Sequence, residues 1–150
     1  MKTPKGKNLR KARFSGTNQI YLITTTTHQR IPLFEDFNCA RFVVHAISHE
    51  DCQAETLAYV VMPDHFHWLM QINEGGKLDK VMQSIKSASS HHINKFHNRK
   101  GPVWQSGYHD HALREEEDLK ATARYVVANP LRAGLVERVG DYPLWDASWL

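Results

Sequence analysis

The stretch of sequence that decides the fold is Tyr59-Val60-Val61-Met62-Pro63-Asp64-His65-Phe66-His67-Trp68-Leu69-Met70. In an extended strand, successive side chains point to opposite faces. His65 and His67 are therefore expected on one face, while Phe66 points from the other face into a core. Two neutral imidazoles held side by side on a rigid strand form a good half of a divalent-metal site. The stretch thus predicts metal-assisted chemistry whose remaining ligands and reacting group lie elsewhere in the chain.

The residues around this stretch predict a series of strands and helices. Pro63-Asp64 marks a turn between two strands. Asp36 is expected to cap a helix that runs to about His49. The predicted strands are 19–27, 55–62, 66–72 and 109–113, and the predicted helices are 36–49, 78–96 and 115–128, followed by a short helical turn and a packed extension.

This order of elements predicts an α+β fold. The sequence β-α-β-β-α-β followed by a helix is typical of a ferredoxin-like (RRM-like) four-stranded antiparallel sheet with helices on one face. The strand that carries His65 and His67 is expected near the middle of this sheet. The face without helices is expected to be open, as in many nucleic-acid binders.

Length and charge suggest one domain with a basic arm. A chain of 150 residues is large enough for a single buried core. We predict a basic flexible arm over 1–17 and one catalytic domain over 18–150. The first 34 residues carry seven basic side chains and no acidic one. A basic arm on a near-neutral body fits a polyanion such as nucleic acid, and a solubilising tail is the alternative.

Membrane and disulfide signals are weak. No apolar run approaches the ~20 residues that span a bilayer, and no apolar segment follows the basic start of the chain. We therefore expect a cytoplasmic protein without a membrane partner. Cys39 and Cys52 do not show the spacing of a zinc motif and are expected to be buried free thiols.

The sequence contains two further pairs of histidines, His109 with His111 and His91 with His92. His109 and His111 also alternate on a predicted strand, but the polar Asp110 between them favours surface histidines over extra ligands. His91 and His92 are adjacent on a predicted helix, so they do not share a face and do not form a ligand pair.

Tyr125 and Asn129 are candidate partners of the histidine pair. They are four residues apart in a predicted helix, and therefore lie on one face. The Tyr125 phenol can attack a phosphorus atom whose oxygen is polarised by a metal, and Asn129 can complete the metal shell. The alternative is that Tyr125 is a core residue and Asn129 a helix C-cap before Pro130.

Several segments together carry a resemblance to a known family. They are Met62-Pro63-Asp64-His65-Phe66-His67-Trp68-Leu69, Ser84-Ile85-Lys86, Gly101-Pro102-Val103-Trp104-Gln105-Ser106-Gly107-Tyr108 and Tyr125-Val126-Val127-Ala128-Asn129-Pro130-Leu131-Arg132-Ala133-Gly134-Leu135-Val136. The opening Leu9-Arg10-Lys11-Ala12-Arg13 and the predicted strand Tyr21-Leu22-Ile23-Thr24-Thr25 also fit this resemblance. In their order and spacing, these segments resemble the HUH single-tyrosine transposases, and among them the REP-associated tyrosine transposases. The resemblance covers almost the whole chain.

The resemblance implies a catalytic mechanism and a cofactor. By it, His65 and His67 bind Mg²⁺ or Mn²⁺ and Tyr125 is the nucleophile that becomes linked to the 5′ phosphate of cut single-stranded DNA. Related insertion-sequence transposases carry Gln four residues after the tyrosine, whereas this chain has the shorter Asn129. The implied substrates are hairpins of repetitive extragenic palindromes, the implied location is the nucleoid, and the implied state is a monomer, with a dimer possible.

Basic residues are expected to hold the DNA backbone. The candidates are Arg10, Lys11, Arg13, Lys86, Arg99 and Lys100. The indole rings of Trp68 and Trp104 could stack on unpaired bases, but a core position is favoured for both.

Two other functions remain open from the sequence. One is a non-catalytic RRM-like nucleic-acid-binding module. The other is a hydrolytic nuclease in which water, not tyrosine, attacks the phosphate.

Overall fold

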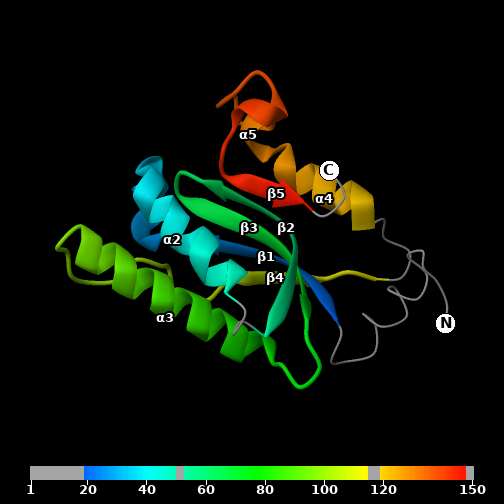
Figure 1. Ribbon diagram of the computed structural model, residues 1–150, viewed down its shortest axis with the longest axis horizontal. Coiled ribbons are helices and arrows are strands. Elements are labelled where there is room, and N and C mark those ends of the chain that lie inside the picture. Colours follow the sequence, from blue (N-terminus) through cyan, green and yellow to red (C-terminus); the bar gives the residue numbers. More distant parts are fainter. Residues whose placement is uncertain (1–18, 50–52, 115–118, 148–150) are drawn as a thin grey trace.

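The computed structural model describes residues 19–49, 53–114 and 119–147 (Figure 1). The strands and helices are β1 Ile20–Thr26, α2 Phe37–Ser48, β2 Ala54–Met62, β3 His65–Ile72, α3 Leu78–Phe96, β4 His109–Ala112, α4 Leu119–Val127, α5 Asn129–Arg132 and β5 Trp145–Ala147. Three short 3-10 turns are η1 His28–Arg30, η2 Leu33–Glu35 and η3 Val139–Asp141. The predicted basic arm, 1–17, lies outside the described residues.

The strands form one antiparallel sheet in the order β4-β1-β3-β2-β5. The predicted α+β order is confirmed, and β3 lies at the centre as expected. The sheet has five strands where the sequence predicted four, because β5 pairs with β2 at its free edge. The sequence did not predict β5, because a strand of three residues is too short to show an alternating pattern. Its pairing with β2 also joins segments that are far apart in the chain.

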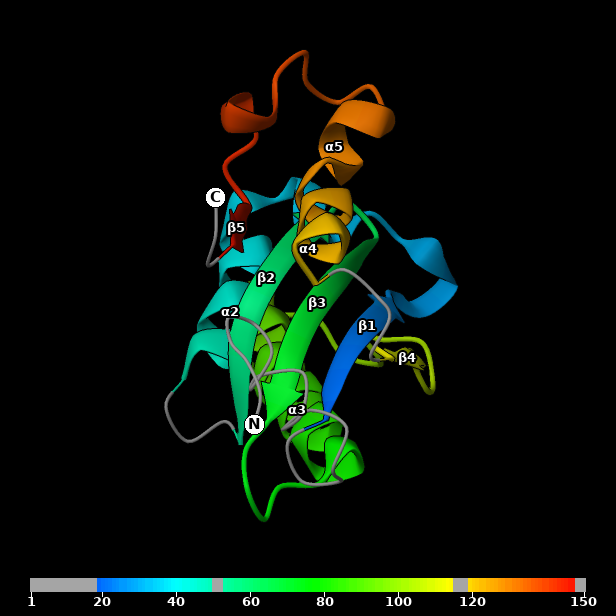
Figure 2. The same ribbon diagram turned by 90° about the vertical axis from the view of Figure 1, so that its right-hand side faces the viewer.

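Side-chain alternation along β3 divides the core into two layers. Phe66, Trp68 and Met70 are buried on the face that α2 and α3 cover. Leu69 is buried on the opposite face, together with Val60 of β2 and Val126 of α4. Figures 1 and 2 show α2 and α3 on one side of the sheet and α4 on the other.

The expectation of one open face was therefore only partly right. α4 packs on β2 and β3, whose side chains are buried on both faces. Such two-sided burial explains the nearly continuous apolar run of β2 around Val60. In Figure 2, α4 lies in front of β2 and β3, while β1 and β4 lie beside it. On the opposite face, Ile23 of β1 is buried in one cluster with Ile93 of α3.

Trp104 anchors the loop before β4 in the core. Its ring lies 5.6 Å from that of Phe66 and 5.3 Å from that of Phe34, and its indole N–H donates to the buried Ser89 hydroxyl at 2.9 Å. Trp104 also forms an isolated β-bridge with Thr27, at the end of β1. The preference for core positions of Trp68 and Trp104 is confirmed, with exposures of 0% and 6%.

Asp36 caps α2 as predicted. Its carboxylate accepts hydrogen bonds from the backbone N–H groups of Asn38 at 2.8 Å and Cys39 at 3.4 Å. The other carboxylate oxygen lies 2.9 Å from Nε2 of His97, which follows the last residue of α3. Cys39 is a free, fully buried thiol, as expected, while Cys52 lies outside the described residues.

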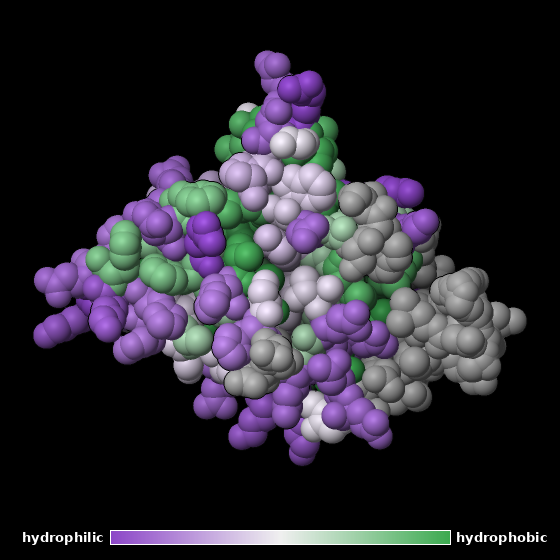
Figure 3. Space-filling view, viewed as in Figure 1, coloured by the Kyte–Doolittle hydropathy of each residue, from purple (hydrophilic) through white to green (hydrophobic). Residues whose placement is uncertain are grey.

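The surface is mainly hydrophilic over α3, and hydrophobic residues gather where α2 begins and α3 ends (green, left in Figure 3). Phe37 and Phe96 are exposed in these elements, at 48% and 51%. Among the described residues, no helix combines the length and the apolar character that crossing a membrane requires.

The cap generates a stability prediction. Asp36→Ala should lower the free energy of unfolding by about 1 kcal/mol, because it leaves two amide groups at the start of α2 without their acceptor. The partly exposed contact with His97 should add little. Asn38→Ala, at an exposed neighbouring position, is the matched control, and urea unfolding of both variants is the measurement. Equal stabilities of the two variants would contradict the role of the cap.

Candidate active site

His65 and His67 form a pair on the central strand, on the same face as α4. Their ring centroids are 4.9 Å apart and the rings are nearly perpendicular, at 78°. Both side chains are half-buried, while Phe66 between them points into the layer below α2 and α3. The structure confirms that His65 and His67 share one face of β3 and that Phe66 points from the other.

Each imidazole is held through its Nδ1 atom. Nδ1 of His65 lies 2.8 Å from a carboxylate oxygen of Asp64. Nδ1 of His67 lies 2.9 Å from the Thr24 hydroxyl on the neighbouring strand β1. Because Nδ1 is engaged in both rings, Nε2 is the nitrogen that each ring can offer to an ion. A carboxylate on the far nitrogen is the usual way to orient a metal-binding histidine and increase its basicity.

Asp64 remains ionised beside His65. Partial burial opposes ionisation, but the hydrogen bond with His65 and the positive charge of Arg30 outweigh it and lower the pKa of Asp64. The Arg30 guanidinium lies 3.1 Å from the second carboxylate oxygen. Arg30, Asp64 and His65 therefore form a chain that fixes the first imidazole.

His67 is neutral over the physiological pH range. Burial, the adjacent His65 and the charge of Arg132 lower the pKa of His67 to about 4. A neutral imidazole keeps the lone pair that coordination requires. The donor set of two oriented histidines therefore fits a divalent cation.

Tyr125 lies on the outer surface of α4. Its side chain is 56% exposed, so the alternative that it is a core residue is wrong. The guanidinium carbon of Arg132 stacks over the Tyr125 ring at 3.9 Å from its centroid. The same positive charge acts on His67. Arg132 thus links the tyrosine on α4 to the histidine pair on β3.

Asn129 does not continue the helix of Tyr125. α4 ends at Val127, as expected for a stop before Asn129-Pro130, and Asn129 begins the short helix α5. Pro130 is accommodated because its ring suits the first turn of a helix. Asn129 is half-buried, and its metal-ligand role stays a prediction.

The predicted DNA-contacting residues have different environments. Arg10, Lys11 and Arg13 lie outside the described residues, and Lys100 is exposed. The Lys86 ammonium donates to the carbonyls of Gln105, at 2.9 Å, and Gly107. Burial lowers the pKa of Lys86.

Arg99 also has protein partners. Its guanidinium donates to the Asn94 side chain at 2.6 Å and to the Pro102 carbonyl at 3.5 Å. Lys86 and Arg99 therefore both brace the segment between α3 and β4. Contacts of the six basic residues with DNA stay a prediction.

The two further histidine pairs of the sequence do not lie beside His65 and His67. His109 and His111 are exposed on the edge strand β4, which β1 separates from β3. His91 and His92 are exposed on α3, on the other side of the sheet.

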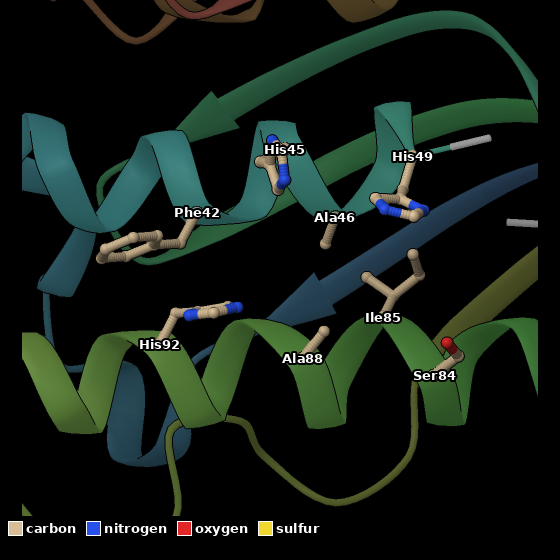
Figure 4. Close-up of a pocket in the computed structure, with 8 residues that line it drawn as sticks. All are labelled: Phe42, His45, Ala46, His49, Ser84, Ile85, Ala88 and His92. Carbon is tan, nitrogen blue, oxygen red and sulfur yellow. The ribbon is translucent and has the colours of Figure 1, made fainter. Parts of the chain in front are cut away.

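A separate hollow of about 340 Å³ lies between α2 and α3 (Figure 4). His45, His49 and His92 line it, and the His92 ring stacks on Phe42 at 5.5 Å. It lies on the sheet face opposite to His65 and His67, so it is not part of the candidate site.

Asp36, Cys39 and His97 are the group of three potential ligands within 4.8 Å of one another in the described part of the chain. Both Asp36 oxygens already serve the cap and His97. Burial and the Asp36 charge raise the pKa of the Cys39 thiol to about 11. A protonated thiol is a poor metal ligand, so this cluster fits a helix cap better than a metal centre.

Sequence reasoning missed two contributors to the site, Thr24 and Arg132. Thr24 lies in the run of threonines that ends β1. This run predicts a strand, but it does not indicate which hydroxyl contacts a histidine. Arg132 lies seven residues after Tyr125, and the turn of the chain at Pro130 brings it back over the phenol ring.

Comparison with known families gives one broad match. The family described as "Transposase IS200 like" matches residues 16–129. A candidate REP-associated tyrosine transposase of Haemophilus influenzae is 31% identical over 99 residues, covering 59% of this chain and 56% of that protein. A REP-associated tyrosine transposase of Escherichia coli is 29% identical over 90 residues, covering 59% and 52%. The matched region thus spans about half the length of these relatives.

Two solved structures share the fold. One is a REP-associated tyrosine transposase bound to a REP hairpin, with a TM-score of 0.71, 23% identity, and coverage of 86% of this chain and 76% of that chain. The other is a candidate transposase from Deinococcus radiodurans, with a TM-score of 0.55, 18% identity, and coverage of 86% and 97%.

The site generates a titration prediction. His67 should titrate near pH 4, and Arg132→Gln should raise this pKa because it removes a nearby positive charge. NMR of the histidine ring protons between pH 3 and 8 is the measurement, and Arg138→Gln is the control. A His67 that titrates near 6.5 in the native protein would contradict the described environment.

The lowered pKa of His67 makes the free energy of unfolding depend on pH. Between pH 6.5 and about 4, the unfolded chain binds a proton at His67 that the folded protein does not bind. Through this group, stability is therefore lost as the pH falls across that window.

Proposed function

The chain belongs to the family of IS200-like transposases, and we propose that it is a metal-dependent single-stranded DNA endonuclease and strand transferase acting through a 5′-phosphotyrosine intermediate. The resemblance to REP-associated tyrosine transposases that the sequence predicts is confirmed by the family match and by the two curated relatives. The catalytic residues that we propose are Tyr125 as the nucleophile and His65 and His67 as the metal-binding pair.

One observation carries this proposal. Arg132 stacks on the Tyr125 ring at 3.9 Å and its charge also acts on His67. One cationic group is therefore in contact with the exposed phenol and acts electrostatically on His67. A phosphate between the phenol and the histidine pair would meet a nucleophile on one side and a metal site on the other, and the guanidinium suits its charge.

The proposed step exchanges one phosphate ester for another. The Tyr125 oxygen forms a bond to phosphorus and loses its proton to solvent. The bond between phosphorus and the 3′ oxygen breaks, and that oxygen takes up a proton to give a free 3′ hydroxyl. The DNA fragment with the 5′ phosphate stays on Tyr125. Because the link preserves the energy of the phosphodiester, attack by another 3′ hydroxyl can reverse the step and join strands.

The histidine pair would hold Mg²⁺ or Mn²⁺, with Asn129 as a further candidate ligand. When bound, such an ion polarises the phosphate oxygen and so favours attack. Asp64 and Thr24 orient the two rings from the other nitrogen. The low pKa of His67, about 4, keeps this ligand unprotonated at neutral pH.

We propose hairpins of repetitive extragenic palindromes as the DNA partner, with a nucleoid-associated location. This extends to the chain what the name of a solved structural neighbour says of that protein, which is bound to a REP hairpin. The basic residues Arg10, Lys11 and Arg13 of the N-terminal segment, together with Lys100, are the proposed backbone contacts. A monomer is the proposed state, by the resemblance to the REP-associated tyrosine transposases.

A covalent adduct is the expected product with a hairpin oligonucleotide carrying single-stranded flanks and a 3′ label, in the presence of Mn²⁺. Tyr125→Phe should reduce adduct formation by more than about 1,000-fold, because it removes the nucleophile. Tyr59→Phe is the matched control, since Tyr59 packs on the opposite face of the sheet. A denaturing gel is the measurement, and an adduct that persists in Tyr125→Phe would refute the assignment.

Metal dependence is tested separately. His65→Ala and His67→Ala should abolish the adduct while hairpin binding persists, and chelator should have the same effect on the unaltered protein. Direct Mn²⁺ titration by calorimetry should show binding that both variants lose. An adduct indifferent to chelator would refute the metal role. Turnover without an adduct would indicate a hydrolytic nuclease, and binding without cleavage under any metal would indicate a nucleic-acid-binding module.

A further inference from the structure

A small polar pocket adjoins the histidine pair at the edge of the sheet. It has a volume of about 330 Å³ and is lined by Thr24, Thr26, Gln105, Ser106, Gly107, Tyr108 and His109. We call it the edge pocket. Thr24 lies opposite His67 and Thr26 opposite His65 in the β1–β3 register. The edge pocket therefore opens on the sheet face that carries the histidines, on the side that α4 leaves uncovered.

The edge pocket and the histidine pair share one side chain. The Thr24 hydroxyl that lines the pocket lies 2.9 Å from Nδ1 of His67. Adjacent antiparallel strands are about 4.8 Å apart. A group in the pocket would thus lie about one strand spacing from a phosphate held at the histidines.

The wall of the pocket is fixed by the protein before any ligand binds. The Gln105 N–H donates to the Thr26 carbonyl at 2.9 Å, and the Lys86 ammonium holds the carbonyls of Gln105 and Gly107. The Tyr108 hydroxyl donates to Asp79. Trp104, directly before Gln105, is anchored in the core. Such bracing reduces the ordering cost that a flexible loop would incur on binding.

The chemistry of the lining suits a nucleobase better than a phosphate. The residues that line it offer hydroxyls, an amide and an imidazole, and none of these seven is a lysine or an arginine. Lysine and arginine neutralise phosphate charge in DNA complexes. Hydroxyls and amides also contact phosphates, but they match in addition the donors and acceptors at base edges. The Gln105 side chain is exposed, and its planar amide carries a donor and an acceptor side by side, as a bidentate contact with a base edge requires.

We propose that the edge pocket receives the unpaired nucleobase next to the scissile phosphate, and that Gln105 selects that base. This inference rests on the proposed function, since it places the cut phosphate at His65 and His67. It adds a determinant of specificity that is separate from the hairpin. Gln105 is a substrate-binding residue here, with no part in the bond exchange at Tyr125.

The test measures rates of adduct formation on oligonucleotides that carry each of the four bases, or an abasic site, at single positions flanking the cut. At one position, the unaltered protein should react about 5- to 150-fold more slowly when the preferred base is replaced or removed, the range expected for loss of a bidentate base contact. Gln105→Ala should abolish this preference at that position alone. Gln53→Ala, an exposed amide near the start of β2, is the matched control.

A second variant separates base reading from general damage to the loop. Gln105→Glu replaces an amide that donates and accepts by a carboxylate that only accepts. It should shift the preference towards cytosine, whose exposed amino group donates, whereas a merely structural role would give slower reaction with unchanged preference. Equal rates on all bases and abasic sites with the unaltered protein, or an unchanged preference in Gln105→Ala, would overturn the inference.

Failure of the proposed function gives a different result. If no oligonucleotide yields an adduct, equilibrium binding of short single strands is measured by fluorescence anisotropy for the same proteins. A base preference in affinity that Gln105→Ala abolishes would keep the pocket as a base site and refute only the catalytic proposal. Absence of both adduct and base preference would overturn both.

Discussion

The structure depends on the alternation of side chains in the central strand β3. Phe66 points into the layer under α2 and α3, where it meets Trp104, and His65 and His67 point to the other face. A slip of one residue in the pairing of β3 would move both imidazoles into the apolar layer under α2 and α3 and the phenyl ring to the opposite face. Burial of Phe66 between β3 and Trp104 therefore sets the register, and the register places the histidine pair. Packing and site geometry are two results of one constraint.

The candidate site is assembled from segments that are far apart in the chain. β1 contributes Thr24 to one imidazole, the turn after β2 contributes Asp64 to the other, and α5 contributes Arg132 above Tyr125. The rings themselves are held by hydrogen bonds at Nδ1 and by burial, which leaves Nε2 as the nitrogen that each ring can offer to an ion. Tyr125 is different, because it lies exposed on a helix that packs on the sheet mainly through its opposite side. A fixed histidine pair and an exposed phenol are the arrangement that the proposed function requires.

The segment from Gly101 to Tyr108 connects the core to the edge pocket. Trp104 is buried against Phe34 and Phe66, yet the next residues form the wall of the edge pocket. The Lys86 ammonium, whose contact with DNA stays a prediction, donates to two backbone carbonyls of this wall. A cation that is bound to backbone carbonyls stabilises the shape of the pocket, whatever it contributes to DNA binding.

Local signals in the sequence determined much of this protein. The apolar periodicity of α3 predicted Leu78–Phe96 correctly, Asp36 was predicted as the cap of α2, and alternation placed His65 and His67 on one face. These features depend on residues close together in the chain. Only the tertiary structure decided the pairing of β5 with β2, the position of α4 on the second face, and the stacking of Arg132 on Tyr125. Each of these depends on contacts between distant segments, whose energy comes from surfaces that meet only when the sheet has formed.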